Sequence, residues 1–308
     1  MKTLHDRIRG CIIGGAIGDY IGSPFEGRPG PIDVAVPVQS AITDDTQLTL
    51  ATCEAIMGSG EPDPDAIARR FSEWYAQRRM TGIGSSTLKA LRDLSFGAHW
   101  ALAGANGEMS AGNGAAMRIA PIAFCVDPLS PDGRKRIKDA SSVTHRNDEA
   151  YVGALAIAIA IAAPDFDFIP TIISALPDSN TRDRLTTLTS EAPSTISALG
   201  VRFGASGYVA DSVPLALVAA SRAETGTFKD AVLGVISAGG DTDTTGSMVG
   251  QIVGSKVGLS CIPEDLQSLS LDSEPVLQIA QNFASFVCKN SESGTSESRL
   301  FRAGTRKA

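Results

Sequence analysis

Residues 239–246 read GGDTDTTG, so two aspartates stand one residue apart among hydroxyls and glycines, where a loop gives way to a helix. Near the other end of the chain, residues 43–46 read TDDT and also open an apolar segment. Capping a helix needs a single acid, whereas neighbouring carboxylates repel one another unless a cation binds them. Together these acids and hydroxyls predict an oxygen-ligand site for one or two hard divalent cations.

Glycines recur at every fourth position in two segments, and this spacing places them on one face of a helix. Each helical glycine costs about 1 kcal/mol relative to alanine, so close approach of another backbone is the expected compensation. We therefore predict that the two helices cross at short distance. Membrane pairing is disfavoured, because Asp19, Gln251 and Lys256 interrupt the two segments. The glycines are Gly10, Gly14, Gly18 and Gly22 in the first segment and Gly246, Gly250, Gly254 and Gly258 in the second.

The composition is that of a globular protein with a core of small side chains. Hydrophobic residues make up 43% of the 308 residues but aromatic residues only 6%, which is typical of closely packed helices. The net charge of −7, without a basic stripe, argues against a general nucleic-acid-binding protein. The five cysteines are scattered without CxxC spacing, and they indicate neither a disulfide framework nor a zinc site.

Nothing in the sequence indicates a secreted or membrane protein. The N-terminal residues are charged and lead directly into the first patterned segment, without the apolar region of a signal peptide. The most apolar run, residues 150–163, is too short to span a bilayer. We therefore expect a cytoplasmic protein that does not bind membranes and that acts as a monomer.

Helical periodicity dominates the chain, and no strand–helix repeat with Rossmann spacing is found. Helices are predicted over residues 42–57, 62–79, 211–220 and 228–236, with a last amphipathic helix over 277–287. We predict one all-α domain over residues 1–289, folded so that the two acidic stretches meet. Residues 290–308 are polar and aperiodic, and we predict that they form a mobile tail.

Three loops carry further candidate residues. Glu26 lies in a loop rich in Pro and Gly after the first glycine helix, although an acid in such a loop is more often solvated. Residues 104–114 form a glycine-rich loop that can bind phosphate through backbone N–H groups, although a plain loop is the commoner outcome. His145 precedes the apolar run, where a surface histidine beside a helix start is the simpler alternative. Only three histidines are present, so a multi-histidine metal site is not indicated.

Four segments occur in a characteristic order: GCIIGGAIGDYIGSPFE at residues 10–26, TDDT at 43–46, SAGNGAAMRIAP at 110–121 and GGDTDTTGSMVG at 239–250. Through them the chain resembles the ADP-ribosylglycohydrolase family, which is typified by the dinitrogenase-reductase-activating glycohydrolase. The resemblance extends over about residues 7–260. It implies a compact all-α orthogonal bundle around a binuclear Mg²⁺ or Mn²⁺ centre.

The resemblance also implies roles for individual residues. Glu26, Asp44 and Asp243 match catalytic positions, and Glu26 matches the loop glutamate that approaches the scissile bond. The residues implied to hold the two metal ions are Thr43, Asp44, Asp45, Asp241, Asp243 and Thr244. The residues implied to contact the substrate are Ser110, Gly112, Asn113, Gly114, Met117, His145 and Tyr208.

The implied activity is hydrolysis of the glycosidic bond of an ADP-ribosylated protein side chain or a small ADP-ribose conjugate, which reverses mono-ADP-ribosylation. Oxygen ligands suit Mg²⁺ or Mn²⁺, and such ions can grip ribose hydroxyls and activate water. Glu26 is expected to position that water or to transfer a proton. Some arginine-directed relatives have an aspartate where this chain has Gly82, so the acceptor stays open between arginine, serine and O-linked groups.

Two other functions are compatible with parts of the sequence. An ADP-ribose-binding relative without catalysis would keep the same motifs, although every acid expected of an active site is present. The run DTDTT also matches the DxDxT pattern of haloacid-dehalogenase-like phosphatases, with residues 231–237 as the preceding strand. That second hypothesis needs a doubly wound domain after the motif, and it leaves residues 43–46 unexplained.

Overall fold

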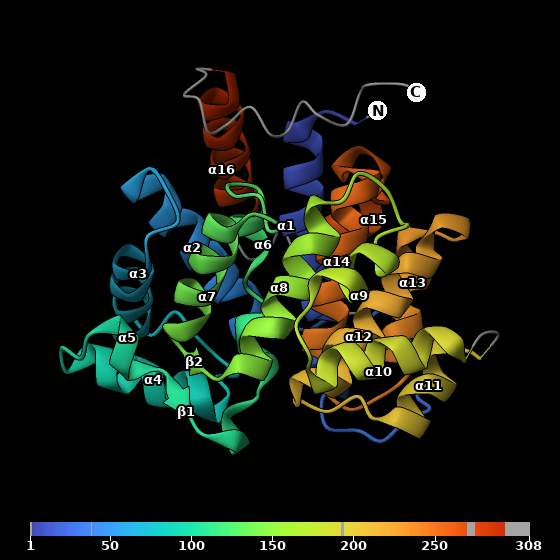
Figure 1. Cartoon of the computed structure of the whole chain (residues 1–308). Coiled ribbons are helices and arrows are strands. Elements are labelled where there is room, and N and C mark those ends of the chain that lie inside the picture. Colours follow the sequence, from blue (N-terminus) through green and yellow to red (C-terminus); the bar gives the residue numbers. More distant parts are fainter. Residues whose placement is uncertain (1, 38, 192–193, 270–274, 293–308) are drawn as a thin grey trace.

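Helices α1 (Leu4–Gly22) and α14 (Thr242–Val257) lie against each other through the middle of the molecule (Figure 1). The computed structural model describes residues 2–37, 39–191, 194–269 and 275–292. A Cβ built on Gly14 or Gly18 would come closer than 3.0 Å to the carbonyl oxygen of Gly250 or Gly246 respectively, and a Cβ on Gly10 would meet that of Gly254 in the same way. The two backbones therefore touch, and the predicted crossing of the glycine helices is confirmed.

The pairing of the glycines runs in opposite directions along the two helices. Gly10 near the start of α1 meets Gly254 near the end of α14, whereas Gly22 at the end of α1 meets the backbone of Thr242. The Thr242 hydroxyl donates a 2.9 Å hydrogen bond to the Gly22 carbonyl. Gly258, the last glycine of its segment, lies beyond the helix and faces the carboxylate of Asp6. This antiparallel register places the loop after α1 beside the start of α14.

The remaining elements are helical with one small exception. The predicted helices are confirmed as α2 (Asp44–Ser59), α3 (Pro64–Ala76), α12 (Val209–Ser221), α13 (Phe228–Ile236) and α16 (Pro275–Glu292). Helix α16 extends past residue 289, and residues 293–308 lie outside the described residues. The other helices are α4 (Ser85–Ser95), α5 (Trp100–Ala103), α6 (Ala120–Ala123), α7 (Pro131–Ser142), α8 (Asp148–Ala162), α9 (Ile169–Ala175), α10 (Asn180–Ser190), α11 (Ile196–Phe203) and α15 (Glu264–Leu269).

Two short strands, β1 (Ala105–Asn106) and β2 (His145–Arg146), pair in parallel. Because β1 lies within the glycine-rich loop of residues 104–114, this pairing joins that loop to the segment just before α8. Short 3₁₀ turns complete the fold: η1 (Ser23–Phe25), η2 (Glu108–Ser110), η3 (Asn113–Ala115), η4 (Arg222–Thr225) and η5 (Leu259–Cys261).

The all-α fold class is therefore confirmed, and it removes the phosphatase hypothesis. Residues 231–236, which would have to form a strand in that hypothesis, belong to helix α13. The described residues after the DTDTT run are helices and turns, with no sheet among them. None of the helices in the described part of the chain combines the length and the apolarity needed to cross a membrane.

Candidate active site

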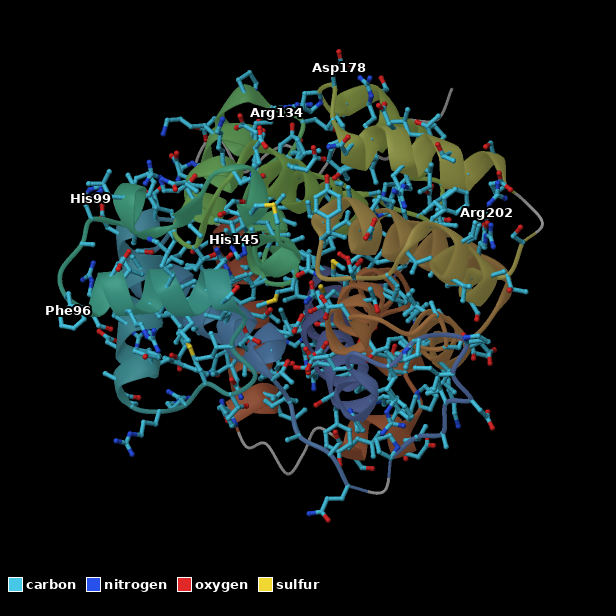
Figure 2. The ribbon with its side chains drawn as sticks, turned by 90° about the horizontal axis from the view of Figure 1, so that it is seen from below. Phe96, His99, Arg134, His145, Asp178 and Arg202 are labelled. Atoms are coloured by element: carbon cyan, nitrogen blue, oxygen red, sulfur yellow. The ribbon has the colours of Figure 1, made fainter. Side chains whose placement is uncertain are left out.

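A pocket of about 220 Å³ opens where the loop after α1, the starts of α2 and α14, the turn before α4 and the glycine-rich loop come together. In a view from below, His145 lies in the interior of the molecule, whereas Phe96, Asp178 and Arg202 lie at its periphery (Figure 2). The residues that line the pocket are Glu26, Asp44, Asp45, Gly82, Gly84, Ser85, Ser86, Thr87, Gly112, Asn113, Gly114, Met117, His145, Gly207, Asp241, Asp243 and Thr244.

The two acidic stretches meet in this pocket. Carboxylate oxygens of Glu26, Asp241 and Asp243 all lie within 4.8 Å of one another. From the opposite wall, Asp45 accepts a 3.1 Å hydrogen bond from the hydroxyl of Thr244, which links the start of α2 directly to the start of α14. The antiparallel glycine register is what makes this contact possible, because it brings the two helix starts to the same end of α1.

The residues present fit a divalent cation. Asp45 is buried, and its Oδ1 has no hydrogen-bond partner among the described residues, although its Oδ2 accepts from Thr244. A buried carboxylate oxygen without a partner is costly unless a cation or water satisfies it. The surrounding atoms are carboxylate and hydroxyl oxygens, which are the ligands that Mg²⁺ and Mn²⁺ prefer.

The electrostatics of the pocket support the same conclusion. Burial, followed by the nearby charge of Asp19, raises the pKa of Asp44 to about 8. Burial followed by the charge of Asp241 raises the pKa of Asp243 to about 9. Burial and the charge of Asp243 hold the pKa of Asp45 well above its usual range. Carboxyls this close and this buried resist ionisation together, and a bound cation is the ordinary means of keeping them all charged.

Asp19, which the sequence hypothesis did not assign to the site, holds the start of α2 in place. This fully buried carboxylate on α1 accepts hydrogen bonds from the backbone N–H of Thr43 at 2.9 Å and from its hydroxyl at 2.9 Å. It also accepts from the backbone N–H of Thr46 at 3.2 Å and from its hydroxyl at 2.5 Å. An acid in the middle of a glycine helix was the available signal, and it was interpreted only as an argument against membrane insertion.

Glu26 reaches the aspartates because its loop is fastened to the loop before α14. The backbone N–H of Gly27 donates to the carbonyl of Gly240, and the N–H of Gly240 donates to the carbonyl of Arg28, each at 2.8 Å. The Glu26 side chain reaches solvent. Its carboxyl is nevertheless partly desolvated, and this desolvation, together with the charge of Asp241, raises its pKa. Glu26 is therefore a carboxylate at the mouth of the pocket with access to solvent.

The glycine-rich loop packs against His145 and reaches the acids through Asn113. A Cβ on Gly114 would lie only 2.7 Å from His145 Cε1, and one on Gly112 would make a tight 3.1 Å contact with His145 Nε2, so a side chain at either position would press on the His145 ring. The amide of Asn113 donates to Asp241 Oδ2 at 2.7 Å and to the Ser212 hydroxyl at 3.1 Å. Asn113 thereby couples this loop to the acidic cluster.

Three residues named from the sequence do not line the pocket. Thr43 lies behind Asp45, and its hydroxyl is within hydrogen-bonding distance of both Asp19 and Asp45. Ser110 donates its hydroxyl to the carbonyl of Asn106 at 2.7 Å. The hydroxyl of Tyr208 accepts from Asn180 at 3.1 Å, although the backbone of Tyr208 pairs with that of Gly112. The roles predicted for these three residues stay predictions.

The structure adds a wall that sequence reasoning did not assign. Gly82, Gly84 and the hydroxyl residues Ser85, Ser86 and Thr87 line the pocket at the start of α4. The sequence showed only a turn into a helix at this point. Because hydroxyls and glycines at a helix start are common in proteins without ligands, the pattern carried no functional signal by itself.

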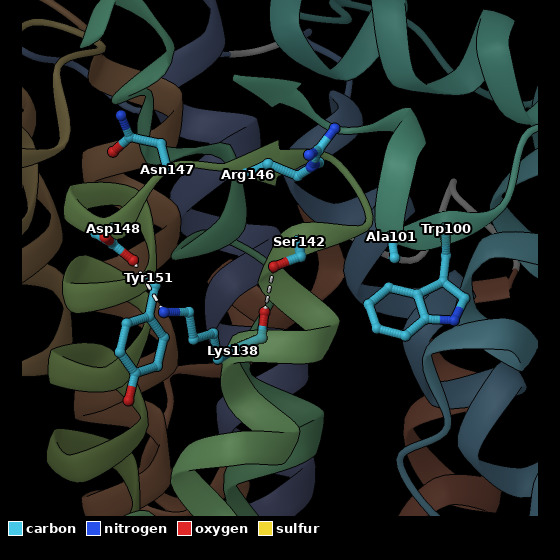
Figure 3. A pocket seen from close by; sticks show the side chains of 8 residues that line it. All are labelled: Trp100, Ala101, Lys138, Ser142, Arg146, Asn147, Asp148 and Tyr151. Carbon is cyan, nitrogen blue, oxygen red and sulfur yellow. Dashed lines mark hydrogen bonds and ion pairs between the residues drawn. The ribbon is translucent and has the colours of Figure 1, made fainter. Parts of the chain in front are cut away.

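A second pocket, of about 210 Å³, lies on the other side of β2 between α5, α7 and α8 (Figure 3). Its cationic side chains already have partners. Lys138 forms a 2.9 Å ion pair with Asp148, and Arg146 donates a 3.2 Å hydrogen bond to the carbonyl of Leu102. We therefore assign no ligand to this pocket.

The fold and the first pocket define an all-α protein with an acid-lined, oxygen-ligand site beside a glycine-rich loop. A family model described as ADP-ribosylglycohydrolase matches residues 1–292, and the chain therefore belongs to this family.

Individual relatives agree with this assignment. The chain is 29% identical to an ADP-ribosylarginine hydrolase Tri1 of Pseudomonas putida, over 90% of this chain and 77% of the relative. It is 25% identical to the ADP-ribosylhydrolase ARH3 of Gallus gallus, over 92% and 94% of the two chains. A solved ADP-ribosylglycohydrolase-related protein complex matches with a TM-score of 0.72 and 26% identity, over 93% of this chain and 100% of the other.

Proposed function

We propose that this protein is a divalent-metal-dependent hydrolase that cleaves the glycosidic bond between ADP-ribose and a protein side chain or a small acceptor. The observation that carries the proposal is the meeting of five carboxylates from three segments in one pocket, where one buried carboxylate oxygen has no partner in the part of the chain that the structure describes. Family membership and relatives named as ADP-ribosyl hydrolases support the substrate class. The release of ADP-ribose would reverse mono-ADP-ribosylation.

Two Mg²⁺ or Mn²⁺ ions would be held by six residues at the two helix starts. Bound there, the ions would supply positive charge that offsets the carboxylates and that orients ribose hydroxyls and water. The residues proposed as ligands are Thr43, Asp44, Asp45, Asp241, Asp243 and Thr244.

The protein's own residues supply binding and proton transfer. Glu26, at the mouth of the pocket and within 4.8 Å of Asp241 and Asp243, is placed to accept a proton from water or to orient it toward the ribose. Gly112 and Gly114 let the backbone approach a diphosphate closely, and Asn113 holds their loop against Asp241. Met117 and His145 line the same part of the pocket.

The acceptor is not decided by the fold. Gly82 has a φ of +73°, and a Cβ built there would lie 3.2 Å from the Thr43 Cβ and 3.8 Å from Asp44 Oδ1. An acid at this position would therefore stand against Asp44, and Gly82 adds no second carboxylate to this corner of the pocket. A comparison of arginine-, serine- and O-acetyl-linked ADP-ribose as substrates identifies the preferred linkage.

The test is metal-dependent release of ADP-ribose from these substrates. We expect no turnover in chelator, recovery with Mg²⁺ or Mn²⁺, and loss of activity by about a hundredfold or more in Asp45→Ala and Asp243→Ala. Asp178→Ala, at the periphery in Figure 2, is the matched control and should retain activity.

Unchanged turnover in either pocket variant would refute the metal assignment. Binding of ADP-ribose without turnover of any linked substrate would instead identify a catalytically inactive binding protein.

A further inference from the structure

Three buried side chains form a hydrogen-bonded relay that runs from Arg118 through Thr144 to His145, which lines the pocket. Arg118 is fully buried, and its Nη2 donates to the Thr144 hydroxyl at 2.7 Å and to the Ala140 carbonyl at 3.1 Å. The oxygen of that hydroxyl lies 2.9 Å from His145 Nδ1. Thr144 is fully buried, and His145 is only 3% exposed.

The order of donors along this chain follows from the chemistry of its members. A guanidinium donates hydrogen bonds and accepts none, so the Thr144 oxygen must be the acceptor from Arg118. The single hydrogen of the hydroxyl is then available to His145 Nδ1, the other atom the described structure places within reach of it. If Nδ1 carried the proton instead, the hydroxyl would receive two donors and its own hydrogen would be buried without an acceptor. Such a loss disfavours the alternative by a factor of about ten or more.

The ring is neutral in this setting. Burial, reinforced by the positive charge of Arg118, lowers the pKa of His145 to about 3. A neutral imidazole carries one N–H, and a ring whose Nδ1 accepts must carry it on Nε2. His145 Nε2 is the ring atom nearest to a Cβ built on Gly112, and His145 lines the pocket.

We propose that Arg118 and Thr144 are positioning residues that hold His145 in its Nε2–H tautomer, so that the imidazole presents a hydrogen-bond donor to an anionic oxygen ligand in the pocket. The identification of that oxygen with the diphosphate or ribose of ADP-ribose rests on the proposed function. The assignment of the tautomer does not depend on the proposed function.

Two features of Arg118 concern how its side chain is held. Within the described part of the chain, its Nε and Nη1 are buried without a hydrogen-bond partner, so the polar contacts of this guanidinium there are those of Nη2 with Thr144 and Ala140. Its guanidinium lies 4.9 Å from the centre of the Phe71 ring, which fixes its direction toward Thr144. Thr144 is fixed in turn, because its carbonyl accepts from Ala105 N–H at 3.0 Å and its N–H donates to the Ser141 carbonyl at 3.3 Å.

The ¹⁵N NMR spectrum of histidine-labelled wild-type protein tests the tautomer directly. The chain has three histidines, so His145 is assigned by the signal that disappears in His145→Gln. We expect Nε2 to be the protonated, pyrrole-like nitrogen and Nδ1 the unprotonated one, without change between pH 6 and 8. A protonated Nδ1, or a mixture of both tautomers, would overturn the proposal, and this measurement requires no replacement of Arg118 or Thr144.

The matched variants Thr144→Ser and Thr144→Val separate the hydroxyl from the shape of the side chain. Thr144→Ser should keep the Nδ1 signal of a hydrogen-bonded acceptor. Thr144→Val should lose it and should bind ADP-ribose about threefold to tenfold more weakly, with unchanged Mn²⁺ affinity. Equal ADP-ribose affinity in the two variants would contradict the positioning role.

Titration of the wild-type protein with ADP-ribose distinguishes this inference from the proposed function. Binding that shifts the His145 Nε2 signal supports both. Binding that leaves this signal unmoved overturns His145 as the donor and leaves the function standing. If ADP-ribose does not bind while the tautomer is as expected, the proposed function fails and the relay is supported.

Discussion

Asp19 shows how one buried acid can organise a site that it does not line. Its carboxylate accepts from backbone and hydroxyl groups of Thr43 and Thr46, and it thereby fixes the first turn of α2, where Asp44 and Asp45 stand. Burial raises the pKa of Asp19, the hydrogen bonds from Thr46 and Thr43 offset part of this rise, and the resulting pKa is about 6. The Asp19 carboxylate is therefore ionised at neutral pH, and the N–H and hydroxyl donors of Thr43 and Thr46 stabilise its charge.

Replacing this acid should weaken both the fold and the site. In Asp19→Asn, an amide N–H₂ would face groups that are themselves donors, and we expect a loss of about 2 kcal/mol or more in the free energy of unfolding. Urea denaturation measures this loss, and Mn²⁺ titration should show weaker binding. Asp230→Asn, which alters the exposed capping box of α13, is the control with a smaller effect. Equal stability losses in the two variants would contradict the organising role of Asp19.

Glu26 is the residue whose replacement should separate turnover from binding. Glu26→Gln keeps the size of the side chain but cannot accept a proton, so we expect turnover to fall by about a hundredfold or more. ADP-ribose binding, measured by calorimetry, should persist because the other lining residues are unchanged. Glu108→Gln, an exposed position on the glycine-rich loop, provides the comparison. A Glu26→Gln enzyme with full activity would exclude Glu26 from proton transfer.

The two glycine helices form the element that aligns these residues. Their contact rests on backbone atoms, since each paired glycine faces a carbonyl of the other helix. Close packing of this kind leaves no room for adjustment, because a side chain at any paired position would push both backbones apart. The separation of α1 and α14 therefore sets how near Asp243 lies to Asp45.

A single methyl group tests this element. Gly250→Ala would direct a Cβ into the Gly14 carbonyl, and we expect a loss of about 2–3 kcal/mol of stability or failure to fold. Gly58→Ala is the matched control, because no described atom outside the local helix turn lies within 4 Å of its Cβ and alanine favours helix. That variant should be neutral or more stable by up to about 1 kcal/mol. Comparable urea midpoints for the two variants would refute the close packing.

For the whole molecule, we expect the acidic pocket to couple stability to pH and to the proposed metal ions. Asp44 and Asp243 have pKa values raised to about 8 and about 9, so between pH 7 and 9 the metal-free folded protein binds more protons than the unfolded chain. Stability contributed by these groups is therefore lost as pH rises through this range. Lys256 has the opposite effect there, because burial lowers its pKa to about 7. The decisive quantity is the difference between metal-loaded and metal-free protein.

We expect the stabilisation by Mg²⁺ or Mn²⁺ to grow as pH rises from 7 to 9. Metal binding must displace the protons on Asp44 and Asp243, and each displaced proton contributes about 1.4 kcal/mol per pH unit. Thermal unfolding with and without metal, repeated along this pH series, measures the effect. Asp243→Asn should flatten the dependence. A metal-induced shift in Tm that stays constant with pH would show that the acids do not bind the ion.

The sequence by itself determined the all-α class and several of its helices, and it predicted the oxygen-rich chemistry of the site. Periodicity predicted the positions of α2, α3 and α13, and the paired acids at residues 43–46 and 239–246 indicated an oxygen-ligand pocket. These signals are local, because helical spacing and neighbouring charges act over a few residues. The monomeric state and the cytoplasmic location stay predictions.

Only the tertiary structure decided which groups share the pocket. The antiparallel glycine register, the support of α2 by Asp19 and the relay from Arg118 through Thr144 to His145 join residues far apart in sequence. The hydroxyl residues at the start of α4 also line the pocket only because the fold brings this helix beside the acidic stretches. Such contacts depend on distances of a few ångströms between elements, and side-chain spacing along one chain does not specify them. Buried polar groups must find partners wherever packing places them, so their pairing is a property of the folded whole.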